Sequence, residues 1–129
     1  MAGVNSVNWF EIYVQDMARA RAFYEAVFDI ALEPLKLPDG DEETLEMWSF
    51  PGDMDRYGAN GALCRMPGAP SGPGGTLVYF ACEDCGATGD RVATAGGRVH
   101  RGKMSIGEYG FIVLAFDSEG NMIGLHSMR

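Results

Sequence analysis

The chain has little cysteine, little histidine and little positive charge. Its 129 residues include three cysteines, two histidines, and ten lysines and arginines against 18 aspartates and glutamates. Three cysteines are too few for a disulfide scaffold, which predicts a reducing, cytoplasmic setting. The net charge of −8 argues against nucleic acid as a partner, because phosphate binding needs a cationic surface.

Long apolar runs are missing as well. No run reaches the roughly 18 residues that a membrane span requires, so no membrane partner is expected. The beginning of the sequence, MAGVNSVNWF, has neither the charged nor the apolar region of a secretion signal. What is present is an ordinary globular composition, with 47% hydrophobic and 22% charged residues in a length that suits one domain.

The predicted elements occur in the same order twice. Residues 7–14, VNWFEIYV, predict a strand, and Asp16 is a candidate cap for the helix that follows. Five apolar residues at helical spacing predict one packing face for this helix: Ala20, Phe23, Tyr24, Val27 and Phe28. Three strands are then predicted, in IALEPLKL, TLEMWSF and NGALCRM.

The second half follows a linker rich in proline and glycine, PGAPSGPGG. It predicts a strand in TLVYFAC, a weak helix in EDCGATGDRVATA, and strands in RVHRGKM, GFIVLAF and NMIGLHSM, with a hairpin turn at DSEGN. Gly96 and Gly97 are expected to end the helix. We therefore expect one domain of two βαβββ modules, over about residues 5–67 and about 76–129, joined by a linker over about 67–75.

Alternation along the first strand predicts two faces, because successive side chains of a strand point to opposite sides. One set is wholly apolar and is expected to pack on the helix: Phe10, Ile12 and Val14. The other set is amphipathic and is expected to face a wetter space: Trp9, Glu11 and Tyr13.

The doubled pattern, with FEIYVQDMARARAFYEAVF early and GEYGFIVLAFDSEGNMIGLHS at the end, resembles the vicinal oxygen chelate superfamily. This superfamily includes glyoxalase I, the bleomycin resistance proteins and the extradiol dioxygenases. The likeness covers nearly the whole chain and looks closest to single-domain, glyoxalase-like proteins related to lactoylglutathione lyase. It implies the α+β glyoxalase/bleomycin resistance/dihydroxybiphenyl dioxygenase fold, in which two βαβββ modules form a curved, barrel-like mixed sheet around a pocket, usually in a homodimer.

The resemblance also implies where a metal would bind, since metal-dependent members take ligands from the first and last strands of each module. These positions fall on Trp9, Leu77 and Gly124, with a fourth near Leu63 or Cys64. Zinc, nickel or iron needs imidazole, carboxylate or thiolate donors, and three of the four positions offer none. No metal and no other cofactor is therefore predicted.

Glu11 and His126 are the candidate acid–base residues. Glu11 lies between Trp9 and Tyr13 on the predicted wetter face, where poor solvation would favour its protonated form and suit proton abstraction. The alternative is a carboxylate paired with an arginine or with backbone donors. His126 shares a strand face with Gly124 but lies roughly 6.6 Å beyond it, too far to replace a metal ligand directly. It is alternatively a structural residue, a polar contact for a ligand, or a ligand of a shifted metal site.

A small-molecule pocket is expected to have aromatic walls with a few polar groups. The candidate lining residues are Trp9, Tyr13, Trp48, Tyr79, Tyr109 and Met122. Core packing explains each of them equally well. Cys82 and Cys85 form a C-x-x-C, which we interpret as structural because no second pair is present to complete a zinc site.

Three functions fit these residues. The first is a small-molecule-binding protein or metal-independent enzyme in which Glu11 and His126 transfer protons. The second is a bleomycin-resistance-type protein that sequesters a drug, since the acidic charge and aromatic side chains suit a flat, cationic ligand. The third is a metal-dependent lyase or dioxygenase, which the ligand positions disfavour. The sequence leaves open the ligand and whether the chain catalyses a reaction.

Overall fold

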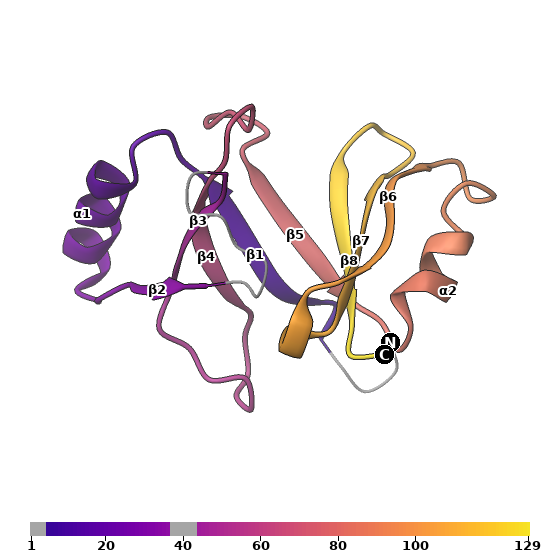
Figure 1. The fold of residues 1–129 in the computed structure, drawn as a ribbon, viewed down its shortest axis with the longest axis horizontal. Coiled ribbons are helices and arrows are strands. Elements are labelled where there is room, and N and C mark those ends of the chain that lie inside the picture. The colour runs from indigo at the N-terminus through magenta and orange to yellow at the C-terminus, as the bar shows by residue number, and fades with distance from the viewer. Residues whose placement is uncertain (1–4, 37–43) are drawn as a thin grey trace. The chain divides into compact units, whose positions relative to one another are not determined.

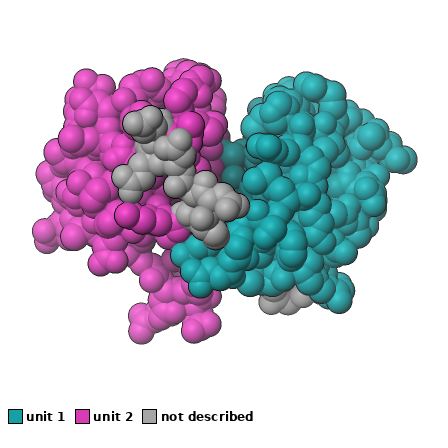
Figure 2. All heavy atoms as spheres, viewed as in Figure 1, with its two compact units in different colours: residues 1–8, 77–129 teal, residues 9–76 magenta. Residues whose placement is uncertain are grey.

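The structure, a computed structural model, describes residues 5–36 and 44–129. They fall into two compact units, one made of residues 9–76 and the other of residues 77–129 with the described residues before Trp9 (Figure 2). Each unit contains nearly all of one βαβββ module, and the predicted order of elements is confirmed (Figure 1). No helix within the described ranges is long and apolar enough to cross a membrane.

The first module has four strands and one helix. They are β1 (Val7–Tyr13), α1 (Met17–Phe28), β2 (Glu33–Leu35), β3 (Glu46–Ser49) and β4 (Asn60–Arg65). The strand order is β2-β3-β4-β1, in which β4 is parallel to β1 and the other neighbours are antiparallel. The first and last strands of the module are thus side by side.

The second module repeats this arrangement. Its elements are β5 (Thr76–Ala81), α2 (Cys85–Asp90), β6 (Arg98–Ser105), the 3₁₀ turn η1 (Gly107–Tyr109), β7 (Phe111–Phe116) and β8 (Met122–Ser127). The order is β5-β8-β7-β6, again with the last strand parallel to the first. Strands β1 and β4 therefore correspond to β5 and β8.

Both helices begin after an aspartate that caps them. The Asp16 carboxylate accepts a hydrogen bond from the Arg19 backbone N–H at 3.0 Å, which confirms the predicted cap. Asp84 caps α2 by accepting from the backbone N–H groups that follow it. The side-chain cap supplies an acceptor for donors that the first turn of a helix leaves unpaired.

The second helix is shorter than predicted. It ends at Asp90, and the chain runs in turns from there until Gly97, so the prediction that Gly96 and Gly97 end the helix was wrong. Two glycines in six residues, Gly86 and Gly89, explain the short length, because each costs about 1 kcal/mol relative to alanine in a helix.

We call the side of each sheet that packs on its own helix the helix face, and the opposite side the far face. In the first module, the helix face is built on Val14 and Leu63, with Ile12 packed against them. Phe10 shares this side and contacts Phe50, at 5.5 Å between ring centroids. The predicted division of the β1 side chains is therefore confirmed.

The packing face predicted for α1 is wrong in part. Ala20 and Tyr24 pack on the sheet, but Phe23, Val27 and Phe28 are 58%, 56% and 59% exposed. Met17, Ala20 and Tyr24 already form a complete stripe at helical spacing, and this stripe leaves the other three side chains to one side of the contact.

The hairpin turn predicted at DSEGN is confirmed between β7 and β8. The Asp117 backbone N–H donates to the Asn121 carbonyl, and the Asp117 carboxylate accepts from the backbone N–H groups of Glu119 and Asn121. The Asn121 side chain and these backbone donors lower the pKa of Asp117. Gly120 takes a φ of 84°, which glycine adopts without strain.

Candidate functional site

Glu11 is a buried carboxylate on the far face of the first module, where β1 places it between Trp9 and Tyr13. The residue is 8% exposed. Its Oε1 accepts a hydrogen bond from the Tyr13 hydroxyl at 2.7 Å, and its Oε2 accepts one from the Trp9 indole N–H at 3.1 Å. Two donors therefore fix the direction of both carboxylate oxygens, and all three groups come from one strand.

The surroundings of this carboxylate are apolar and include a buried thiol. Ala62 of β4 pairs opposite Glu11, and it forms a buried cluster with Cys64 on which the Trp9 and Tyr13 side chains pack. Burial, and then the charge of Glu11, raises the pKa of the Cys64 thiol and of the Tyr13 hydroxyl. Both groups stay protonated, so Tyr13 remains a hydrogen-bond donor to the carboxylate.

An aromatic ring takes the corresponding place in the second module. Tyr79 pairs opposite Gly124 on β8, as Glu11 pairs opposite Ala62. Tyr79 is 6% exposed and its ring covers Gly124, because a Cβ added to this glycine would lie 2.2 Å from Tyr79 Cδ1. Only glycine leaves room for the ring, and the far face here carries aromatic surface in place of a carboxylate.

His126 uses both ring nitrogens within the second unit. Its Nε2 lies 2.6 Å from the Tyr109 carbonyl oxygen, and its Nδ1 lies 3.1 Å from the Asn8 side-chain nitrogen. A carbonyl oxygen only accepts, so Nε2 carries the hydrogen and Nδ1 accepts from the Asn8 amide. This arrangement favours the structural alternative for His126, as a link between η1 and the start of β1.

The structure brings together only part of the predicted pocket. Met122 and Tyr79 lie on the far face of the second module, by the alternation that places Ile123 and Leu125 on its helix face. Tyr109 lies on η1 and is 38% exposed.

Trp48 does not share the face of Glu11. It packs on the helix-face cluster of the first module, with the Arg21 guanidinium 3.5 Å from its ring centroid. In β3 it pairs with Leu63, and this register decides its side.

The positions that the resemblance assigns to a metal do not fit one. Trp9 and Leu77 have no ligand atom, and the space beside Gly124 is taken by the Tyr79 ring. The parallel register places Ala62 where the second module has Gly124, so the fourth position is Ala62 and neither Leu63 nor Cys64. In the described ranges, 5–36 and 44–129, no group of three His, Cys, Asp or Glu side chains could hold a metal ion.

The family follows from the sequence match together with this fold. A family model described as the Glyoxalase/Bleomycin resistance protein/Dioxygenase superfamily matches residues 6–125, and the chain belongs to this family. The resemblance and the fold class predicted from the sequence are thereby confirmed.

Individual relatives are more distant. The chain is 30% identical over 112 residues to proteins named "Putative glyoxylase CFP32" in Mycobacterium bovis and Mycobacterium tuberculosis. This match covers 87% of the chain but only 40% of each relative, so the chain spans less than half of their length.

Solved structures of the same fold include a methylmalonyl-CoA epimerase from Mycobacterium tuberculosis, with a TM-score of 0.67 and 16% identity over 100% of this chain and 93% of that one. A hypothetical protein from Bacillus halodurans matches with a TM-score of 0.68 and 10% identity, covering 95% of this chain and 94% of that one. The Streptomyces coelicolor methylmalonyl-CoA epimerase in complex with 2-nitronate-propionyl-CoA matches with a TM-score of 0.65 and 16% identity. This match covers 97% of this chain and 98% of that one. At these identities the likeness shows the fold alone.

Proposed function

We propose that this chain binds a small organic molecule on the far face of its first module and acts on it without the family's metal, with Glu11 as the group that accepts a proton. The observation that carries the proposal is the Glu11 carboxylate, which is nearly buried and is held by the Trp9 indole and the Tyr13 hydroxyl. A carboxylate ordered in advance among apolar side chains suits proton transfer to or from a bound ligand.

The neighbours of Glu11 have supporting roles in this proposal. Tyr13 stays protonated and holds one carboxylate oxygen, while Trp9 holds the other and offers its ring as apolar surface. His126 has no proton-transfer role here, because both of its ring nitrogens are engaged.

No step of this function passes through a metal, because the side chains at the implied ligand positions supply no donor atoms. Metal analysis of protein purified without chelators tests this part. We expect substoichiometric zinc, nickel and iron. A stoichiometric ion that chelators remove together with ligand binding would contradict it.

Sequestration of a ligand without chemical change is the second candidate. The observation that favours it is that both Glu11 oxygens already accept hydrogen bonds, which suits holding a polar ligand group as well as moving a proton. Under this alternative the ligand is released unaltered, as in the drug-binding members that the resemblance implies.

A matched pair of variants distinguishes the two functions. Small molecules that raise the melting temperature are selected first, since ligand binding stabilises the folded state. Each is then incubated in D₂O with the wild type, Glu11→Gln and Glu46→Gln, and its C–H exchange is followed by NMR. Glu46 is the control, because it accepts from the Trp48 indole at 3.2 Å in the same i, i+2 arrangement but on a different strand.

We expect the wild type to catalyse exchange, and Glu11→Gln to slow it by at least about 100-fold while binding is retained. Glu46→Gln should exchange at the rate of the wild type. Equal exchange by Glu11→Gln and wild type would rule out Glu11 as the base. Tight binding by the wild type with no exchange and no product would establish sequestration instead.

Assembly as a homodimer is a further inference from the resemblance, and a cytoplasmic location is a further inference from the low cysteine content. The exposed Phe23, Val27 and Phe28 side chains of α1 support a self-association surface. Light scattering coupled to size exclusion tests the dimer, with a monomer at micromolar concentration as the contrary result.

A further inference from the structure

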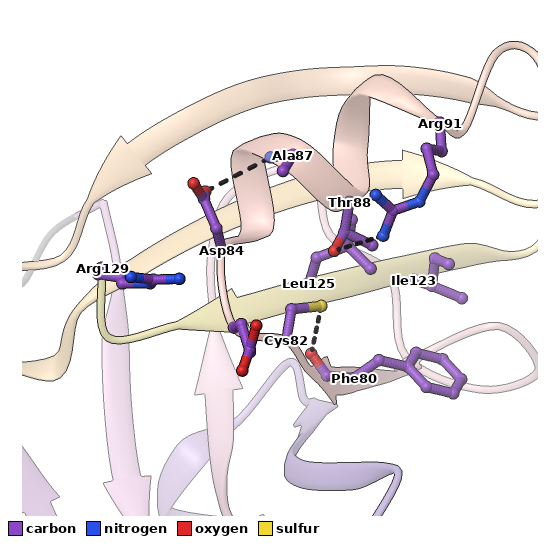
Figure 3. A pocket seen from close by; sticks show the side chains of 10 residues that line it. Phe80, Cys82, Asp84, Ala87, Thr88, Arg91, Ile123, Leu125 and Arg129 are labelled. Atoms are coloured by element: carbon purple, nitrogen blue, oxygen red, sulfur yellow. Dashed lines mark hydrogen bonds between the residues drawn. The ribbon is translucent and has the colours of Figure 1, made fainter. Parts of the chain in front are cut away.

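The helix face of the second module contains a hollow of about 630 Å³ beside α2 (Figure 3). Its floor is apolar and comes from β5 and β8, through Phe80, Ile123 and Leu125. The side facing the helix includes Thr88 and Arg91. The volume falls within the range of about 300–1,000 Å³ that is usual for small-molecule sites.

The hollow has a structural cause, which the first module makes clear. There α1 runs for 12 residues, and Tyr24, Trp48 and Phe50 cover the equivalent floor. In the second module α2 runs for only six residues and packs on the sheet through Cys85 and Gly89, while the small side chains of Ala87 and Thr88 line the hollow. Phe80 and Ile123, which a longer helix would cover, are therefore only partly buried, whereas Leu125 between the strands stays buried.

Charge is unevenly distributed around this hollow. Its acidic lining residues, Glu83 and Asp84, precede α2, and the Asp84 carboxylate already accepts from Lys103 Nζ at 3.0 Å. Arg91 follows α2 and lies at the opposite end of the hollow from Arg129 (Figure 3). Among the residues that the structure describes, no acidic side chain lines the hollow at the Arg91 end, although Asp90 precedes Arg91 in the chain. A cation beside an apolar floor is notable in a chain of net charge −8.

We propose that this hollow binds a small amphipathic carboxylate. The anionic group lies against the Arg91 guanidinium and the Thr88 hydroxyl, which are 3.3 Å apart and both able to donate to it. The hydrocarbon part lies on Phe80, Ile123 and Leu125, where burial of apolar surface favours binding. This site is distinct from the Glu11 site, and the test of one proposal does not decide the other.

The chain contains a natural reporter for this site. Cys82 lines the hollow and is partly exposed, whereas Cys64 and Cys85 are 1% and 0% exposed. Alkylation of the folded protein by iodoacetamide is therefore expected to modify Cys82 first. An occupant of the hollow will slow this reaction, and mass spectrometry follows it directly.

The experiment compares three probes of equal chain length: decanoate, decanol and decylamine. Protection of Cys82 is titrated with each probe, and backbone amide shifts of Phe80 and Ile123 give a second, independent readout. Arg91→Ala removes the proposed partner of the carboxylate. Arg56→Ala is the matched control, because Arg56 is an exposed arginine of the first unit, paired only loosely with Asp53 at 3.5 Å.

We expect decanoate to protect Cys82 more strongly than decanol, and decylamine to protect it least. Arg91→Ala should weaken the affinity for decanoate about tenfold, which is the usual effect of losing one charge-assisted hydrogen bond. Arg56→Ala should leave this affinity unchanged. Ala87→Trp, which fills the hollow from α2, should abolish protection by every probe.

Three results would overturn the proposal. The first is no protection of Cys82 and no shift of the Phe80 and Ile123 amides with any probe. The second is equal protection by decanoate and decylamine, which would mean that charge plays no part. The third is protection by decanoate that Arg91→Ala leaves unchanged, which would place the carboxylate elsewhere.

Discussion

In the first module β1 presents Glu11 opposite Ala62, and in the second module β5 presents Tyr79 opposite Gly124. The backbone pairing is the same in both places, yet one far face holds a carboxylate fixed by two donors and the other holds a ring lying over bare backbone. The difference teaches that the repeated strand pairing determines where side chains project. The identity of the residues at matching positions determines what chemistry each module offers.

The helix faces differ in a similar way. A 12-residue helix covers the first floor, whereas a six-residue helix leaves a hollow above the second. Leu63 and Leu125 occupy matching positions on β4 and β8, because each follows the residue that pairs with Glu11 or Tyr79. The same substitution at both positions therefore measures what the two helices contribute.

The largest effect is expected from this pair. Leu63→Ala should lower the free energy of unfolding by about 4 kcal/mol, because Leu63 is fully buried under the longer helix. Leu125→Ala should lower the free energy of unfolding by about 2 kcal/mol, because the space left by the side chain adjoins the hollow and water can fill it. Urea unfolding measures both. A greater loss for Leu125→Ala would contradict the account of the two helix faces.

The next effect concerns the glycine beneath the aromatic ring. Gly124→Ala should cost about 2 kcal/mol, because its Cβ would meet the Tyr79 ring and force it to move. In a Tyr79→Ala background the same change should be neutral or stabilising, and a double-mutant cycle measures this coupling. Ala62→Gly is the matched control, expected to cost about 1 kcal/mol from backbone freedom alone.

Alkaline stability should distinguish the modules through Cys64 and Tyr13. Their folded-state pKa values are raised, so the unfolded chain releases these protons first, beginning near the ordinary values of 9.0 and 10.0. The free energy of unfolding should therefore be constant below about pH 8 and fall above it, by up to about 1.4 kcal/mol per pH unit for each ionised group. Urea unfolding between about pH 7 and 11 measures the slope.

Cys64→Ala and Tyr13→Phe should each reduce this alkaline slope. The second module has His126 and Ala81 at the matching positions, so it contributes neither a thiol nor a phenol there. A slope that neither substitution changes would show that the loss arises elsewhere in the chain.

The smallest effects are expected at the helix caps. Asp16→Ala should lower the free energy of unfolding by about 1 kcal/mol, because it leaves the Arg19 N–H without its acceptor.

Asp84→Ala should lower the melting temperature by less than Asp16→Ala does, because α2 is short and the Lys103 contact is exposed. Hydrogen bonds from Lys103 and the backbone lower the pKa of Asp84, so its contribution is present above pH 3.8 and is lost as the pH falls through the folded value. Thermal unfolding at neutral and acidic pH should show the Asp84→Ala difference disappear in acid.

Local patterns predicted much of the fold and the centre of the candidate site. The sides of β1, the Asp16 cap and the turn at Asp117 depend on neighbouring residues, and all three are confirmed. The grouping of Glu11 with Trp9 and Tyr13 follows from strand alternation alone.

Features that depend on distant partners were beyond these patterns. The side of Trp48 is decided by the pairing of β3 with β4, and the partner of His126 Nδ1 is Asn8, which lies 118 residues away in the chain. The exposure of Phe23 depends on which stripe of α1 contacts the sheet, which helical spacing alone does not reveal. The end of α2 at Asp90 depends on how far its packing on the sheet offsets the helix cost of Gly86 and Gly89.

The parallel pairing of β1 with β4 also bears on how the protein is synthesised. A nascent chain cannot hydrogen-bond Val7–Tyr13 to its partner within the module until the ribosome has released the residues up to Arg65. During that interval the unpaired backbone edge of this strand is free to associate with other chains, and such long-range pairing is slow to form. Expression is therefore expected to depend on chaperones that shield this first strand until translation of the module is complete.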